Sequence, residues 1–430
     1  MEEVGKRINI AQQDTCEEIL NCVKPSSYFG FIEHNGIKSP SQRIEYIGRN
    51  TNYTPVKVTM GGGFNLNGWA DFPVLLANKP YMVRADGTPD YRLNENDYTK
   101  KEDGSASDIA NTSYNGGAFS WLAKIYKKEY MAGQDRCVLF SMTKAPGFEA
   151  VGFTDETGAE LEGMWIPMFY GSVLGADKEK PKMVSLSGLQ PGYNRNTDQE
   201  HTAIANFSPR GSFLGGPIVE TITDLLMMFA KTSDIQDAYG YGNCGGYDAS
   251  LAPTYGVKQN AVIGGGQFYG TNDNKSLNKI LHSVVLGSWQ QWQRDPYEVV
   301  VNGHVKVSKN YKYDPTGATY TDTGIVVPDN MTWDGGQNAL DYPAEYRAVQ
   351  GYGSIPAGTM KDGTSSTGGC DGLWRKDPKQ AFVAVCLRFG YCGDWGLGGP
   401  RARLWDYAAG AAWWSYGASV LLKPPVGVAV

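Results

Sequence analysis

Hydrophobic residues recur at intervals of three and four positions, the spacing of one helix face, in two places along the chain. The first is 218–230, with Ile218, Ile222, Leu225, Leu226 and Phe229, and the second is 277–285, with Leu277, Ile280, Leu281, Val284 and Val285. A shorter segment, 12–23, carries Thr15 and Glu18 at the spacing of a capping box, in which each side chain bonds a free amide at a helix start. The pattern therefore predicts two helices in the middle of the chain and a short one near its beginning.

Short hydrophobic runs bounded by Gly, Pro and Asp predict β-strands on both sides of the two central helices. They fall in 28–98, in 117–173 and again from 298 onward. The run EVVVNGHVKV (298–307) places Asn302-Gly303 between two alternating halves, which is typical of a two-residue hairpin. Because strands and helices do not alternate regularly, the order favours an α+β fold over a doubly wound parallel sheet.

Changes in this pattern divide the chain into three parts. Residues 1–27 contain the N-terminal helix, and we expect them to act as an attachment segment. Residues 28–113 form a small β-rich domain that ends in a polar linker, and residues 114–430 form a larger domain with loop insertions. A chain of 430 residues is long enough for two or three domains.

Charge and hydropathy exclude two kinds of partner. The net charge is −6, and no block of Lys and Arg supplies the basic surface that nucleic acid requires. The N-terminus MEEVGKRINI lacks a signal peptide, and no apolar run approaches about eighteen residues. We therefore expect a chain that is made in the cytoplasm, binds no nucleic acid and inserts into no membrane.

Motifs of common metal, nucleotide and hydrolase sites are missing from the sequence. The four His are scattered, and neither H-E-x-x-H nor G-x-S-x-G occurs. A G-x-G-x-x-G match at 240–245 follows a helical pattern instead of a strand, so a flexible loop is the expected structure there. The sequence predicts no metal, no cofactor and no catalytic residue.

Cys386 and Cys392 flank Arg388, and this arrangement has two interpretations. A neighbouring guanidinium can lower a thiol pKa and create a reactive pair. Alternatively, Cys386 in the apolar run AFVAVCL is a buried thiol. The seven Cys are irregularly spaced and contain no C-x-x-C, which favours the structural interpretation.

The segment 381–422 has an unusual composition. It contains no Lys, Glu, Gln or Met, and yet it holds four of the eleven Trp of the chain. Rigid aromatic rings among small residues are typical of recognition surfaces, because a ring buries much area at little cost in rotamer freedom. The alternative is that the rings fill a core. We expect a mixture, with Trp414 in the core and Trp405, Tyr407 and Tyr416 exposed.

The run LRFGYCGDWGLGGPRARLWDYAAGAAWWSYGASVLL (387–422) resembles the variable region of target proteins of diversity-generating retroelements. In that family a C-type-lectin-like domain of the formylglycine-generating-enzyme type ends in a segment of the form R-G-G-x-W…G-P-R-A…A-A…W-x-x-G-A. Mutagenesis at template adenines rewrites selected codons of this segment. The whole chain, from FGFIEHNGIKSPSQRIEYIG onward, is similar to the long form found in tailed phages of gut bacteria as a tail-fibre or receptor-binding protein.

The resemblance implies two interleaved sets of residues in the diversified segment 381–422. Framework positions of the family match Arg388, Gly390, Gly399, Pro400, Arg401, Ala402, Ala408, Ala409, Trp414, Gly417 and Ala418. Ligand-binding positions match Tyr391, Asp394, Trp395, Leu397, Arg403, Trp405, Asp406, Tyr407, Trp413, Ser415 and Tyr416. Phe389 and Cys392 replace the usual Gly and Trp of the first motif. Rewritten AAC or AAT codons never yield Lys, Glu, Gln, Met or Trp, which fits the four missing types but leaves Trp395, Trp405 and Trp413 to another origin.

The family therefore implies a non-enzymatic adhesin on the phage virion that binds a glycan or a protein of the bacterial surface. Other tail proteins would hold the chain through its N-terminus, and a homotrimer is expected because adhesins carried on fibres are often trimers. Several copies on one particle supply avidity, so a modest affinity at each site suffices. Two other classes stay open. One is an enzyme, either a formylglycine-generating-type oxidase using Cys386 and Cys392 or a capsule-degrading fibre with paired carboxylates. The other is a purely structural tail or head component.

Overall fold

The computed structural model describes residues 28–59, 62–175, 179–328, 338–360, 363–376 and 382–430. The predicted helix at 12–23 and the attachment segment 1–27 lie outside these residues. The protein is mainly β, with 35% strand and 14% helix, and includes a nearly closed, barrel-like sheet. In the described ranges, no helix combines the length and the apolar character that crossing a membrane requires.

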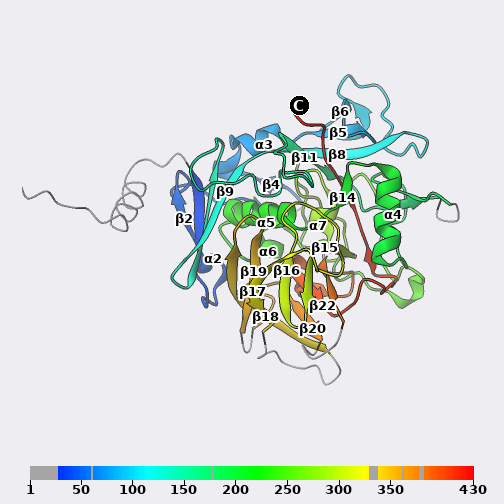
Figure 1. Cartoon of the computed structure of the whole chain (residues 1–430). Helices are drawn as coiled ribbons and strands as arrows, with labels where there is room; N and C mark the ends of the chain where they lie inside the picture. Colours follow the sequence, from blue (N-terminus) through cyan, green and yellow to red (C-terminus); the bar gives the residue numbers. More distant parts are fainter. Residues whose placement is uncertain (1–27, 60–61, 176–178, 329–337, 361–362, 377–381) are drawn as a thin grey trace, which may run out of the picture.

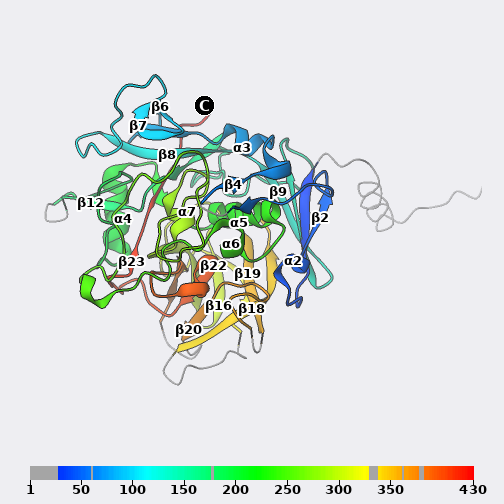
Figure 2. The same cartoon turned by 180° about the vertical axis from the view of Figure 1, so that it is seen from behind.

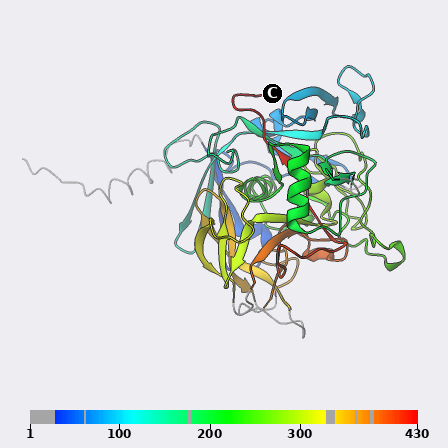
Figure 3. The same ribbon diagram turned by 45° about the vertical axis from the view of Figure 1, so that its right-hand side comes forward.

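Helix α5 (Pro217–Ala230) lies at the centre of the molecule, and all of its residues are buried. It begins at Pro217, whose fixed φ suits the first helical turn, and ends at Ala230, after which Lys231 adopts the left-handed conformation. Figure 1 shows strands above, below and to one side of α5, and Figure 3 shows the helix almost end-on with strands around it. The helix predicted at 218–230 is therefore confirmed, although its whole circumference is buried.

The helix predicted at 277–285 is wrong for most of its length. Only α7 (Val284–Ser288) is helical, beginning after Ser283, whose Oγ accepts from the amide of Leu286. Leu281 and His282 have positive φ, which breaks a right-handed helix. The apolar residues of this segment are all buried in the core, and the segment that carries them is irregular. Their spacing therefore does not indicate one face of a helix.

Two antiparallel sheets cover α5 on its upper and lateral sides (Figures 1 and 2). The lateral sheet has the order β2 (Ile44–Gly48), β1 (Phe29–Glu33), β10 (Asp135–Ser141), β9 (Tyr126–Ala132). The upper sheet has the order β14 (Gly211–Phe213), β24 (Val420–Leu422), β11 (Gly163–Pro167), β8 (Gly116–Ala123), β5 (Pro80–Arg84), β6 (Pro89–Asn94), β7 (Asp97–Lys101). This upper sheet joins strands from both sides of the expected domain boundary at residue 113.

A nine-stranded sheet lies below α5 and contains three strands of the segment 381–422, which we call the C-terminal segment (Figure 1). Its order is β17 (Thr321–Val326), β16 (His304–Val307), β15 (Trp292–Val301), β21 (Ala384–Phe389), β22 (Gly399–Trp405), β20 (Leu373–Lys376), β18 (Asn338–Val349), β19 (Gly353–Met360), with β23 (Tyr416–Gly417) pairing β15 in parallel. The predicted hairpin at Asn302-Gly303 is confirmed, since Val301 pairs with His304 across it. Strands β21 and β22 are interior strands, and every residue in them is buried.

The other elements are short and connect these sheets. They are α2 (Pro40–Arg43), α3 (Pro73–Ala77), α4 (Thr197–Phe207), α6 (Ile235–Tyr239), β3 (Lys57–Val58), β4 (Phe64–Asn65), β12 (Ser172–Leu174), β13 (Lys182–Val184), and the 3₁₀ turns η1 (Asn67–Trp69), η2 (Ala249–Leu251) and η3 (Trp395–Leu397). Helix α4 is a regular element with a complete capping box, formed between Asn196 and Gln199. It stands beside the C-terminal segment, and the amide of its first residue, Thr197, donates to the carbonyl of Ala409.

Candidate functional site

Three buried arginines hold the C-terminal segment to the rest of the fold. Arg388 on β21 donates to Glu220, Asp295 and Glu298 at 2.5, 2.5 and 2.7 Å. Arg403 on β22 donates to the same Glu220 and Glu298 at 2.6 and 3.0 Å. Burial alone would raise the pKa of Glu220, but the guanidinium groups of Arg403 and Arg388 lower it well below its usual range. The pKa of Glu298 is lowered in the same way, whereas burial raises the pKa of Asp295, so Glu220 and Glu298 are the carboxylates that the arginines hold ionised.

Arg401, two residues before Arg403 on β22, makes the third anchor. Its guanidinium donates to both oxygens of Glu33, at 2.8 and 3.1 Å, and lies 3.2 Å from the ring centroid of Tyr346. Glu33 is on β1, so this ion pair links the C-terminal segment to the lateral sheet. Arg388 and Arg401, which the resemblance assigns to the framework, are both buried.

Arg403 and Trp405 are not on the surface, contrary to the expectation for ligand-binding residues. Arg403 belongs to the buried ion-pair network, and the indole of Trp405 is 2% exposed and donates to Glu298 Oε1 at 2.8 Å. Tyr416 is also buried, at 6% exposure, instead of exposed. Arg403 and Trp405 are buried because β22 is flanked by β21 and β20 and both of its faces are covered, and Tyr416 is buried because β23 pairs with β15. Sequence composition does not reveal that placement.

The loops that leave these strands converge on a pocket of about 250 Å³. It is lined by Trp292, Trp374, Tyr391, Asp394, Leu404, Asp406, Tyr407, Trp413, Trp414, Ser415 and Tyr416. Seven of the eleven predicted ligand-binding residues are in this set: Tyr391, Asp394, Asp406, Tyr407, Trp413, Ser415 and Tyr416. We call it the C-terminal pocket.

The backbone of the loop 406–415 is fixed by residues outside the C-terminal segment. The amide of Asn194 donates to the carbonyl of Trp413 at 3.0 Å, and Arg294 donates to the carbonyl of Ala411 at 2.6 Å. The side chain of Trp413 is nevertheless 58% exposed. A loop held by its main chain tolerates different side chains, because few of its anchoring bonds depend on side-chain identity.

Carboxylates and ring hydroxyls supply the polar part of the C-terminal pocket. Asp394 Oδ2 accepts from the amide of Tyr391 at 2.8 Å, and burial raises the pKa of Asp394 well above its usual range. Burial also raises the pKa of Tyr391, to about 12. The carboxyl of Asp394 is therefore held in a low-dielectric position at the wall of the pocket, where it can exchange hydrogen bonds with a ligand.

Trp395 and Leu397 lie on η3, beside the C-terminal pocket and outside its lining. The Trp395 side chain is 57% exposed, and its backbone adopts a positive φ of 53°. The amide of Trp395 donates to the carbonyl of Cys244 at 2.7 Å, which fixes this turn against the loop that follows α6. Leu397 is half-buried.

Two tryptophans of the pocket come from outside the C-terminal segment and were not predicted. Trp292 on β15 and Trp374 on β20 meet edge to face, with centroids 5.2 Å apart. Trp414, predicted to be core, is only partly buried, and its ring lies 5.6 Å from Tyr391 and 4.7 Å from Tyr255. Trp292 is remote in sequence and joins the site only through sheet pairing, so no local pattern indicates it.

Cys386 and Cys392 do not have the features of an activated thiol pair. Both are buried, and burial raises the pKa of Cys386 well above its usual range and that of Cys392 to about 12. A nucleophilic thiol requires the opposite shift. Cys386 packs in an apolar cluster on β21, and the Cys392 thiol faces the carbonyl of Tyr255 at 3.5 Å.

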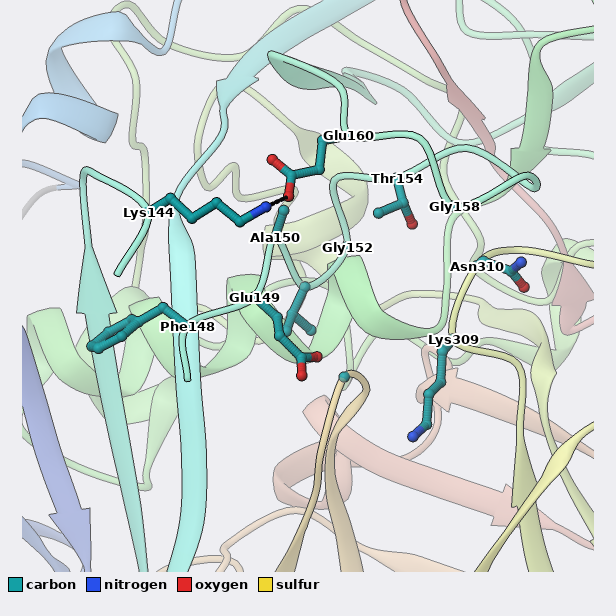
Figure 4. A pocket seen from close by; sticks show the side chains of 12 residues that line it. Lys144, Phe148, Glu149, Ala150, Gly152, Thr154, Gly158, Glu160, Lys309 and Asn310 are labelled. Carbon is teal, nitrogen blue, oxygen red and sulfur yellow. Dashed lines mark hydrogen bonds and ion pairs between the residues drawn. The ribbon is translucent and has the colours of Figure 1, made fainter. Parts of the chain in front are cut away.

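A second pocket, of about 290 Å³, lies near the first turn of α5 and holds none of the predicted residues (Figure 4). Glu149 and Glu160 both line it. Lys144 donates to Glu160 at 2.6 Å and lowers its pKa, whereas a general acid needs a raised pKa. Glu149 accepts from Gln350 at 2.7 Å. The carboxylates of this pocket thus bind neighbouring side chains and do not have the features of a catalytic acid.

The described part of the chain contains no group of three or more His, Cys, Asp and Glu side chains arranged to hold a metal ion. Comparison with known proteins finds no family that matches the chain and no curated protein that matches it. The functional assignment therefore depends on the resemblance of the C-terminal segment and on the geometry of the pocket that this segment forms.

Proposed function

We propose that this protein is a non-enzymatic, receptor-binding adhesin of a phage virion, and that the C-terminal pocket binds a ligand on the bacterial surface. The observation that carries the proposal is the convergence of seven family-implied ligand positions on one pocket. Five aromatic rings of the pocket wall, those of Tyr391, Tyr407, Trp413, Trp414 and Tyr416, come from the segment itself. Aromatic residues in such positions dominate recognition energetics.

The segment 381–422 consists of buried strands, which we call its frame, and of the loops between and after them. This division supports the proposal that the segment is diversified. Arg388, Arg401 and Arg403 bind the strands to the core, while the loops between and after the strands carry most of the segment's pocket residues. Changes confined to loop side chains would alter the ligand without disturbing these ion pairs. This arrangement suits a C-type-lectin-like variable domain, and we propose that fold family for residues 114–430. A trimer held to other tail proteins through residues 1–27 belongs to the same proposal.

Retention of the purified chain on a panel of gut bacterial strains tests the adhesin function. The double variant Tyr407→Ala/Trp413→Ala should lose retention on every strain that retains the wild type. Leu76→Ala and Val326→Ala, at side chains that are 54% and 47% exposed away from the pocket, are the matched controls. Equal retention of the double variant and the controls would contradict the proposal, provided that all melt at the same temperature.

The flanking DNA tests the diversification independently. The proposal expects a near-identical copy of the 381–422 coding segment that differs only at adenines and lies beside a reverse transcriptase gene. A genome without this copy would contradict the diversification of the segment by a retroelement. The adhesin function would then be tested by the retention experiment alone.

One observation favours a second candidate function, the hydrolysis of a surface glycan in the same pocket. Asp394 and Asp406 both line it, and the raised pKa of Asp394 suits a general acid. Reducing ends released from the surface polysaccharide of a retained strain measure this activity. Hydrolysis requires that the wild type release them and that Asp394→Asn abolish the release. Retention without release supports the adhesin.

A further inference from the structure

A third and larger pocket, of about 580 Å³, lies in the loop that follows α6. Its lining comes from residues 243–258 together with Lys275, all outside the C-terminal segment. Side chains of Tyr247 and Leu251 are 50% and 52% exposed. We call it the loop pocket.

The loop is attached to the C-terminal segment by its backbone. The amide of Tyr247 donates to the carbonyl of Cys392 at 2.7 Å, and the amide of Trp395 donates to the carbonyl of Cys244 at 2.7 Å. Asp248 accepts from the amide and the hydroxyl of Ser250 at 2.9 and 2.6 Å, which builds the turn η2. The loop pocket therefore has a fixed position relative to the C-terminal pocket.

A cluster of three mutually contacting rings, which we call the aromatic ridge, connects the two pockets. Tyr247, which lines the loop pocket, stacks on Tyr255 with centroids 6.0 Å apart and planes within 2°. Trp414, which lines the C-terminal pocket, lies 4.7 Å from Tyr255 and 6.0 Å from Tyr247. An extended ligand can thus pass from one pocket to the other over the aromatic ridge.

The two linings have the chemistry of a site for a polyhydroxylated ligand. Pockets for apolar side chains or drug-like molecules are mainly hydrophobic with a few polar groups. Here carboxyl, hydroxyl, amide and amine groups accompany the rings: Asp394, Asp406 and Ser415 in the C-terminal pocket, and Asn243, Ser250, Thr254, Lys258 and Lys275 in the loop pocket. Rings cover the apolar faces of sugar rings, while such polar groups exchange hydrogen bonds with sugar hydroxyls.

We propose that the two pockets form one extended site for a bacterial surface glycan of at least two sugar units. One unit lies in the C-terminal pocket, the next lies in the loop pocket, and the chain crosses the ridge of Tyr247, Tyr255 and Trp414. This inference rests on the proposed adhesin function. It adds a ligand class and a second half of the site that does not belong to residues 381–422.

The test uses the full chain and cells of a strain that retains it. One portion of cells is oxidised with periodate, which cleaves vicinal diols of sugars, and then quenched; a second portion is treated with proteinase K. Retention should be lost after periodate and preserved after proteinase K. Survival of retention after periodate with loss after proteinase K would overturn the glycan while leaving the adhesin function intact. Failure of every strain to retain the chain would instead remove the proposed function itself.

Two exposed-residue variants test the second half of the site. Tyr247→Ala and Lys258→Gln should each weaken binding to untreated cells, Tyr247→Ala by about tenfold, which corresponds to ~1.4 kcal/mol. Leu76→Ala is again the control, and melting temperatures show that each variant is folded. Wild-type binding by both Tyr247→Ala and Lys258→Gln would confine the ligand to the C-terminal pocket and contradict the extended site.

Discussion

Arg403 Nη2 donates to Glu220 Oε1 at 2.6 Å, and both side chains are buried. This bond joins a strand of the C-terminal segment to the central helix α5, across 183 positions of sequence. Arg388 donates to the same oxygen of Glu220 at 2.5 Å. The segment that carries the pocket therefore has its strands fixed by ion pairs, and only its loops are free to differ.

Removing Arg403 should strongly destabilise the fold. Arg403→Met leaves Glu220 and Glu298 with less compensation for their buried charge, and the loss of one partner of such a pair costs about 3–5 kcal/mol. Chemical denaturation measures the change. Arg84→Met, which removes an exposed pair with Asp90, is the control and should leave the midpoint unchanged. A midpoint for Arg403→Met within error of the wild type would contradict the role of the network.

Two tryptophans of the same segment should behave oppositely. Trp405→Ala removes a buried ring and its bond to Glu298, so we expect a loss of about 3–5 kcal/mol in the free energy of unfolding. Trp413 is 58% exposed, so Trp413→Ala should change that free energy by less than ~0.5 kcal/mol and affect cell retention instead. Thermal melts measure the stability of each variant, and retention assays measure its binding to cells. Equal stability of the two variants would refute the assignment of frame and loop.

The sequence indicates the C-terminal segment as the site but not the placement of its individual rings. Composition and motif pick out 381–422, and seven of the predicted residues do line one pocket. Trp405 and Trp413 are the same residue type in the same segment. Trp405 is buried because β22 lies between β21 and β20, whereas Trp413 lies in the loop 406–415 and is exposed. Trp292 and Trp374 enter the pocket through sheet pairing over long sequence separations, which local patterns do not encode.

Because sequence patterns report only local properties, some predictions about the fold were confirmed and one was wrong. The Asn302-Gly303 hairpin depends on two residues with positive φ, a local property, and it is confirmed. The helix at 218–230 also follows from its own periodicity. The apolar spacing at 277–285 is similar, but left-handed Leu281 and His282 turn that segment into an irregular core passage. Burial on all sides removes the contrast between faces that helix prediction requires.

Gly399, the first residue of β22, should not tolerate a side chain. Its φ is +155°, and a Cβ there would lie 2.3 Å from Oδ1 of the buried Asp371. We expect Gly399→Ala to cost at least about 2 kcal/mol. Gly410, in the loop 406–415, has nothing within 4 Å of the position of a Cβ, so Gly410→Ala should change stability by less than ~1 kcal/mol. Denaturation midpoints check both, and the reverse order would contradict the description of frame and loop.

Lys279 should make stability depend on pH in the alkaline range. Its amine donates to Tyr98 Oη and to the carbonyl of Gly264 at 3.0 and 2.8 Å, and burial lowers its pKa to about 7. Between about pH 7 and the ordinary lysine pKa, the unfolded chain binds a proton that the folded chain does not. This difference makes stability rise with pH, by at most ~1.4 kcal/mol per unit. Lys279→Met should remove that rise, and identical pH profiles for wild type and variant would disprove it.

Side-chain protection tests the central claim most directly, because it locates the ligand on the folded wild-type chain. Hydroxyl-radical oxidation read by mass spectrometry is compared with and without a surface extract from a retained strain. Trp413 and Tyr407 should become protected by the extract, while Leu76 and Val326 react as before. Unchanged oxidation of Trp413 and Tyr407, with protection appearing instead at another surface such as Phe148 in the pocket of Figure 4, would contradict it.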